Sequence, residues 1–168
     1  KDLIERDFRN LWVIATLLIA MGLVLGLADR LGRTDKEIKS ITLRDAVLMG
    51  AAQALALVPG LSRSGATLSM GRALGYDREA ATRYAFLLAV PAVMASGLYK
   101  LKDIGEDSSA AWGPTILATV IAFVIGYGVI AWLLRYVANH TFTIFVIYRL
   151  ALAALLVGLL ATGTIAAT

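Results

Sequence analysis

The 168-residue chain contains no cysteine and only one histidine. Without thiols there are no disulfides and no thiolate metal ligands, and a lone histidine argues against a histidine-based metal site. Charged residues make up 17% of the chain, against about 25% in typical soluble proteins, while 59% of the residues are hydrophobic. We therefore expect an integral membrane protein built as one domain over residues 1–168.

The basic residues do not indicate a nucleic-acid partner. The net charge is +4, but most of the charge lies in connectors between apolar runs, where membrane topology and lipid head groups explain it better. The chain starts at Lys1 without a methionine, and its first residues do not resemble a signal peptide. We expect it to be a piece of a longer protein.

Four apolar runs are read as membrane spans, at 11–28, 84–98, 112–134 and 142–161. Pro91 predicts a kink in the second run. Gly22 and Gly26 form a Gly-x-x-x-Gly pair that would let another helix approach closely, although glycine is also simply common in membrane helices. The segments 29–44, 76–83, 100–109 and 135–141 are expected to be polar connectors.

A further apolar run is interrupted at its centre by Pro59-Gly60. Its first half, 46–58, reaches only about 20 Å as a helix, against a hydrocarbon core of about 30 Å. The second half, 66–74, is shorter still and ends at Gly75, a typical C-cap. This pattern predicts a re-entrant helical hairpin over 46–74, with one broken spanning helix as the alternative. The predicted fold class is all-α integral membrane, with about four transmembrane helices and one re-entrant hairpin.

Arg63 lies directly behind this break. An unpartnered guanidinium at that depth is costly, and the sequence places no acid at matching depth because all 12 acids fall in loops or at helix ends. A helix that begins just after Arg63 favours an anion there, and an arginine fork suits phosphate oxygens. The neighbours that would add hydroxyl donors are Ser62, Ser64 and Thr67, and those that would let backbone approach an oxyanion are Gly60 and Gly65. The segment predicts a phosphate cradle; the alternative is that Ser64 caps a helix while Arg63 snorkels to water.

Two further polar residues lie in apolar surroundings. Arg149 is on an unbroken run without a hydroxyl cluster, which favours a structural buried charge over a catalytic one. Gln53 precedes the break by one to two turns, and both a structural and an active-site role are open. Neither a nucleophile elbow nor a P-loop occurs in the sequence.

The segment from Gln53 to Thr67, QALALVPGLSRSGAT, resembles a signature motif of the undecaprenyl-diphosphatase family of the bacitracin-resistance type. Tyr84–Pro91 and Phe145–Arg149 are similar to later parts of that family, in the same order. The match extends over nearly the whole chain. It covers only the C-terminal part of the family's length, because the family's first motif, with its glutamates and paired serines, does not occur here.

The resemblance implies a multi-pass phosphatase of the bacterial inner membrane. Such an enzyme converts undecaprenyl diphosphate to the monophosphate carrier lipid of cell-wall synthesis, needs Mg²⁺ or Ca²⁺, and is an inverted repeat of which this chain would form half. The implied catalytic residues are Arg63, Ser62 and Thr67, and the implied substrate-binding residues are Ser64, Gly60, Gly65 and Gln53. The metal ligands would come from the absent first motif, so the 168 residues alone are expected to be inactive.

Two other functions compete with this one. A transporter or flippase of an anionic polyprenyl-phosphate lipid, or of another anionic solute, would use the same broken helix without hydrolysis. A structural membrane subunit would leave Arg63 and Arg149 unexplained. The oligomeric state is open, a homodimer being one option.

Overall fold

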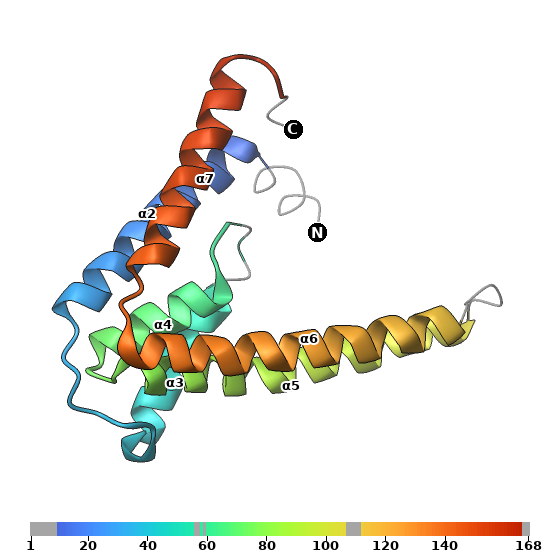
Figure 1. Ribbon diagram of the computed structural model, residues 1–168, viewed down its shortest axis with the longest axis horizontal. Coiled ribbons are helices and arrows are strands. Elements are labelled where there is room, and N and C mark those ends of the chain that lie inside the picture. The colour runs from blue at the N-terminus through green and yellow to red at the C-terminus, as the bar shows by residue number, and fades with distance from the viewer. Residues whose placement is uncertain (1–9, 56–57, 59, 107–111, 166–168) are drawn as a thin grey trace.

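A computed structural model describes residues 10–55, 58, 60–106 and 112–165, with the backbone alone for 101–106. Its elements, in chain order, are α2 (Leu11–Leu31), the 3₁₀ turn η1 (Ile38–Ser40), α3 (Leu43–Leu55), α4 (Arg63–Ala73), α5 (Arg78–Glu106), α6 (Trp112–Asn139) and α7 (Thr143–Ala161). The residues described contain no strand, and only an isolated bridge pairs Lys36 with Tyr76. The all-α prediction is therefore confirmed (Figure 1).

Four of these helices are long and apolar enough to cross a membrane: α2, the segment Arg78–Lys100 of α5, α6 and α7. They confirm the four predicted spans and make the chain a multi-pass membrane protein. The predicted ends of three spans were wrong, because α2 continues to Leu31, α5 takes in polar residues on both sides of 84–98, and α6 continues to Asn139. At the start of α5, the Asp77 carboxylate accepts a hydrogen bond of 2.6 Å from the Ala80 amide, which begins the helix at Arg78. The helix also continues through Pro91.

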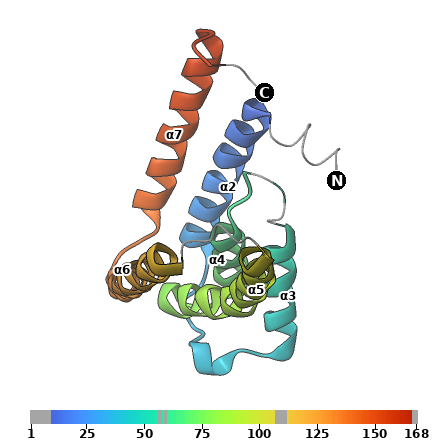
Figure 2. The ribbon, with the colours of Figure 1, turned by 90° about the vertical axis from the view of Figure 1, so that its right-hand side faces the viewer.

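The short helix α4 occupies the centre of the fold and contacts α2, α3 and α5. Helices α2 and α7 pack along one another, while α5 and α6 pair into a long arm that extends away from them (Figures 1 and 2). A Cβ atom on Gly22 would lie 3.7 Å from Cβ of Arg149, and one on Gly26 would lie 3.5 Å from Cγ2 of Val146. The two glycines thus provide the face on which α7 approaches α2, as the Gly-x-x-x-Gly spacing predicts.

Helices α3 and α4 are the two short helices expected around the break, and they pack against each other. Helix α4 begins at Arg63 rather than Ala66, because the Ser62 hydroxyl accepts a hydrogen bond of 3.2 Å from the Gly65 amide. Its end confirms the C-cap at Gly75, which has a φ of +92°. The Gly75 amide donates to the Arg72 carbonyl, and the Tyr76 amide donates to the Gly71 carbonyl, the paired bonds of a Schellman motif. Pro59 lies outside the described residues.

A buried ion network closes the polar end of the fold. Arg72, 1% exposed, donates from Nε to Oδ1 of Asp29 at 3.2 Å, and Asp29 itself is 5% exposed. The other guanidinium donors of Arg72 reach the carbonyl oxygens of Asp29, Gly32, Arg33 and Tyr76. Local sequence does not reveal Arg72 as a buried residue, and Asp29 belongs to the segment 29–44, which was expected to be a solvated connector. Every donor of Arg72 is satisfied, so the charge is structural.

A second polar cluster lies outside the four candidate spans. The Tyr76 hydroxyl donates to Oδ2 of Asp45 at 2.7 Å, and Nζ of Lys36 lies 3.4 Å from the same oxygen. The hydrogen bond from Tyr76 holds the pKa of Asp45 below its ordinary value. Burial, followed by the hydrogen bond to Asp45, raises the pKa of Tyr76 to about 12. The cluster fixes the connector after α2 against the turn between α4 and α5.

Candidate anion-binding site

A cavity of about 250 Å³ lies at the N-terminal end of α4. Ser62, Ser64 and Gly65 from the start of α4 line it together with Arg149 and Tyr148 of α7 and Thr82 of α5, whose hydroxyl already donates to the Arg78 carbonyl. Apolar side chains of α2, α5, α6 and α7 complete the wall, among them Leu25, Phe86 and Phe145. The cavity thus brings together three of the predicted site residues, Ser62, Ser64 and Gly65, with Arg149, whereas Arg63 does not line it.

The Arg149 guanidinium lies against the backbone of Gly65. A Cβ atom on Gly65 would be 3.2 Å from both Nη1 and Nη2, closer than ordinary van der Waals contact. Nη1 is buried and has no hydrogen-bond partner among the described residues. The structural pairing predicted for Arg149 therefore has no counterpart in the part of the chain that is described. Leaving a charged donor buried and unsatisfied costs more than the roughly 1–3 kcal/mol of a neutral one, so Nη1 requires a further partner, which is either a ligand anion or a carboxylate from another segment of the protein.

The backbone of α4 adds positive character at the same place. The first amides of a helix have no partner within it, and here the Ser62 hydroxyl takes only that of Gly65. Within the described residues, the amides of Arg63 and Ser64 make no hydrogen bond. The Ser62 and Ser64 hydroxyls lie 3.2 Å apart and can both turn toward a ligand. A guanidinium, a helix N-terminus and two hydroxyls at one cavity form a site suited to a phosphate group.

The other predicted site residues lie outside this cavity. Arg63 is exposed at the first position of α4. The buried Thr67 hydroxyl donates to the Arg63 carbonyl at 3.0 Å, so it serves the helix. Gln53 donates to the Leu88 carbonyl at 3.4 Å, which links α3 to α5. Gly60, with a φ of +91°, packs against α2, where a Cβ atom would lie 3.1 Å from that of Leu17.

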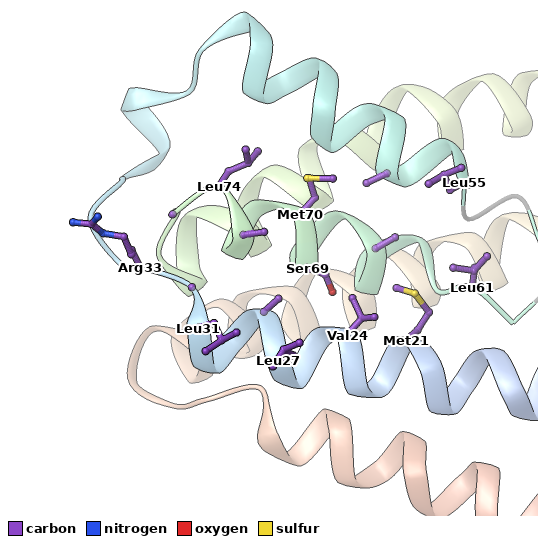
Figure 3. Close-up of a pocket in the computed structure, with 16 residues that line it drawn as sticks. Met21, Val24, Leu27, Leu31, Arg33, Leu55, Leu61, Ser69, Met70 and Leu74 are labelled. Atoms are coloured by element: carbon purple, nitrogen blue, oxygen red, sulfur yellow. The ribbon is translucent and has the colours of Figure 1, made fainter.

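A second, larger cavity of about 690 Å³ lies between α2, α3 and α4. Figure 3 shows its apolar lining, with Met21, Val24 and Leu27 of α2 opposite Met70 of α4. Its hydroxyl, from Ser69, is already used in a 2.7 Å hydrogen bond to the Gly65 carbonyl. Its one charged side chain, Arg33, is already paired with Asp35 at 2.8 Å, so the lining as a whole is apolar and less suited to an anion than the smaller cavity.

The described residues do not supply a cage for a divalent cation. They contain no cluster of three or more histidine, cysteine, aspartate or glutamate side chains. The two buried acids, Asp29 and Asp45, are occupied by Arg72 and Tyr76 respectively. Mg²⁺ and Ca²⁺ prefer several oxygen ligands, often carboxylates, so the described residues alone do not fit either cation.

In the described residues, the fold and the cavity together define an all-helical, multi-pass membrane protein in which a partly buried arginine lies at a helix N-terminus. Comparison with protein families identifies it further, because the family model described as bacitracin resistance protein BacA matches residues 1–155. The chain belongs to the BacA family.

Curated relatives match almost all of the chain. The undecaprenyl-diphosphatase of Nocardioides sp. is 67% identical over 168 residues, covering 99% of this chain and 61% of that protein. The undecaprenyl-diphosphatase of Micrococcus luteus is 54% identical over 171 residues, covering 99% of this chain and 62% of the relative. In Agrobacterium fabrum, undecaprenyl-diphosphatase 2 is 53% identical over 168 residues, with 99% and 60% covered. The chain thus spans about three-fifths of the length of these relatives.

Proposed function

We propose that the protein carrying this chain hydrolyses undecaprenyl diphosphate to undecaprenyl phosphate and inorganic phosphate. The observation that carries the proposal is the buried Nη1 of Arg149, without a partner among the described residues, beside the N-terminus of α4. The names of the relatives, undecaprenyl-diphosphatase in Nocardioides sp. and Micrococcus luteus, support the same substrate.

In this proposal the cavity binds the terminal phosphate. Arg149 donates to its oxygens, and the amides of Arg63 and Ser64 with the hydroxyl of Ser62 complete the set of donors. Hydrolysis breaks the bond between the terminal phosphorus and the bridging oxygen. The terminal phosphate takes its new oxygen from water, and the bridging oxygen leaves with the lipid monophosphate. Donors held in place before reaction stabilise the charge that develops on the phosphoryl oxygens.

Arg63 completes the proposed site from outside the cavity. It is the first residue of α4, and its exposed side chain can reach an anion at the cavity mouth. A diphosphate has two phosphate groups, so we assign the terminal group to Arg149 and the lipid-linked group to Arg63. Arginine suits both because its planar fork binds two oxygens at once.

The proposal includes a setting and a cofactor. We place the protein in the bacterial inner membrane, where its product is the carrier lipid of the cell wall. We expect activity to require Mg²⁺ or Ca²⁺. The described residues contain no cluster of ligands for such a cation, so the requirement is tested by removing the cation. In a phosphatase, such a cation would neutralise charge on the diphosphate.

The test is phosphate release from undecaprenyl diphosphate by the full-length protein in detergent, with Mg²⁺ and with a chelator. We expect cation-dependent release, reduced about 10²-fold by Arg149→Ala, as for the loss of one key electrostatic donor. Arg135→Ala, an exposed arginine of α6 outside the cavity, is the matched control and should retain activity. Lipid binding without phosphate release would refute the hydrolase and favour the transporter or flippase. Full activity in Arg149→Ala would refute the site.

A further inference from the structure

One face of α2 makes a series of contacts with α7 that runs from the polar end of the fold toward the cavity. Gly22, Gly26 and Asp29 are spaced by four and three residues, which places them on one side of a helix. Their partners on α7 run in the opposite direction: Arg149 opposite Gly22, Val146 opposite Gly26, and Phe142 opposite Asp29. Along this interface, the contact nearest the polar end of the fold is made by Asp29, and the contact nearest the cavity is made by Arg149.

The contact made by Asp29 is a hydrogen bond to Phe142, 113 residues later in the chain. Oδ2 of Asp29 accepts from the Phe142 amide at 3.1 Å, and Phe142 is the N-cap residue of α7. No side chain of α7 caps its own start, so the negative charge of Asp29 serves that end from α2. The bond sets both the height and the rotation at which α7 begins.

The same carboxylate also holds α4 and α5. Its other oxygen, Oδ1, accepts from Nε of Arg72 at 3.2 Å and from Nε of Arg78 at 2.7 Å. Arg72 lies in the last turn of α4, the helix whose first turn lines the cavity. One side chain therefore fixes α4 and α7 relative to each other.

We propose that Asp29 is a positioning residue for the anion site, setting the register of α7 against α4 so that Arg149 lies over Gly65. Phe142 and Arg149 are seven residues apart, which puts them on the same face of α7 about 10 Å apart along its axis. A shift or rotation at Phe142 therefore moves Arg149 directly. Asp29 itself lies outside the cavity and touches no anion. The inference rests on the proposed function only in taking Arg149 as an anion ligand.

The chain offers a matched control for the loss of a buried aspartate. Asp45, 6% exposed, is also hydrogen-bonded at the polar end, but its partners are Tyr76, Lys36 and Thr42 rather than any residue of α7. Asp45→Asn should affect stability without moving Arg149. Asp29→Asn keeps the size of the side chain and removes the charge that holds Arg72, Arg78 and the α7 amide.

The experiment is a double-mutant cycle on the binding of inorganic diphosphate, measured by titration calorimetry on the full-length protein in detergent. We expect Arg149→Ala to lower affinity about tenfold, as for one hydrogen bond to a charged group. Asp29→Asn should lower affinity about three- to tenfold in the wild-type background, and by less than about twofold when Arg149 is already alanine. Asp45→Asn should change affinity by less than about twofold, whatever its effect on thermal unfolding.

Other results separate the two proposals. If Arg149→Ala binds diphosphate like the wild type, or the wild type does not bind it, the proposed site fails and the positioning role fails with it. If Arg149→Ala loses affinity while Asp29→Asn retains it, only the positioning role is wrong. Equal losses from Asp29→Asn in both backgrounds would make Asp29 merely structural and would also overturn it.

A milder variant covers the case in which Asp29→Asn does not fold. Arg78 is partly exposed and supplies one of the donors to the Asp29 carboxylate. Arg78→Ala therefore removes one hydrogen bond to Asp29 and leaves those from Arg72 and Phe142 in place. We expect about a twofold loss of diphosphate affinity that disappears in the Arg149→Ala background. An unchanged affinity in Arg78→Ala, with Asp29→Asn unfolded, would overturn the positioning role.

Discussion

Gly65→Ala separates the anion site from the stability of the fold. Gly65 has ordinary helical geometry in the first turn of α4, so alanine fits its backbone conformation. Replacing glycine by alanine in a helix is favourable by up to about 1 kcal/mol. The new methyl group, however, would lie 3.2 Å from both terminal nitrogens of Arg149 and 3.3 Å from Cβ of Ser62.

The geometry sets the size of the expected effect. At 3.2 Å the new methyl group is closer than ordinary van der Waals contact, so the guanidinium must move away by a few tenths of an ångström. A misplacement of about 1 Å at a reacting centre can cost about 10²-fold in rate. We therefore expect Gly65→Ala to lower diphosphate affinity, and turnover in the full-length protein, by about tenfold. The midpoint of thermal unfolding should stay the same or rise slightly.

Two measurements on the same samples check this prediction: titration calorimetry with inorganic diphosphate, and circular dichroism during heating in detergent. The control is Gly50→Ala in α3, because a Cβ atom on Gly50 would meet nothing within 4 Å. That variant should gain stability and keep its affinity. Wild-type affinity in Gly65→Ala would show that the anion does not bind beside Arg149. A loss of affinity accompanied by a large drop in thermal stability would contradict the reasoning as well.

Three further predictions concern single side chains. Arg63→Ala should abolish turnover in the full-length protein, and Arg63→Lys should restore little, because a point charge cannot replace a two-pronged fork; phosphate-release assays of both variants test this. Ser62→Ala should lower turnover by about tenfold or less at equal expression, as for one hydrogen bond to a charged ligand; a loss as large as that of Arg63→Ala would indicate a covalent or proton-transfer role. Tyr76→Phe should lower the unfolding midpoint by a few degrees near pH 6. Since the Asp45 pKa is lowered in the fold, this difference should be full above about pH 4 and shrink as the pH falls further, which melting curves from pH 3 to 7 would show.

The sequence was sufficient for the features that depend on local composition. Apolar runs predict the four spans because a membrane helix needs about 20 apolar residues. Gly60 and Gly75, both at positive φ, mark the two ends of the α4 segment, since few other residues adopt that conformation. The helix ends were less predictable. Ser62 and Asp77 begin α4 and α5 through single hydrogen bonds that other nearby residues could equally have made.

The candidate site could be predicted only in part, because it joins segments far apart in the chain. Hydroxyl and glycine residues around a helix start are visible locally, and they predicted the α4 side of the cavity. That Arg149 joins these residues depends on how α7 packs, which no local pattern reveals. One signal was available: Asp29 follows Gly22 by seven residues, so a face already expected to contact a helix also carried a carboxylate.

The hydrogen bond by which Asp29 of α2 caps the start of α7 has a consequence for how the protein is assembled. Chains are synthesised from the N-terminus, so Asp29 enters the membrane long before Phe142, its partner 113 residues later. Arg72 and Arg78 follow it by only 43 and 49 residues, and they neutralise its charge while the last two helices are still being made. The carboxylate oxygen Oδ2 is then already in place to accept the hydrogen bond from the Phe142 amide. We expect insertion to proceed through an intermediate that contains α2 to α5. Helix α7 then packs onto this intermediate, and its Phe142 amide forms the hydrogen bond to Asp29.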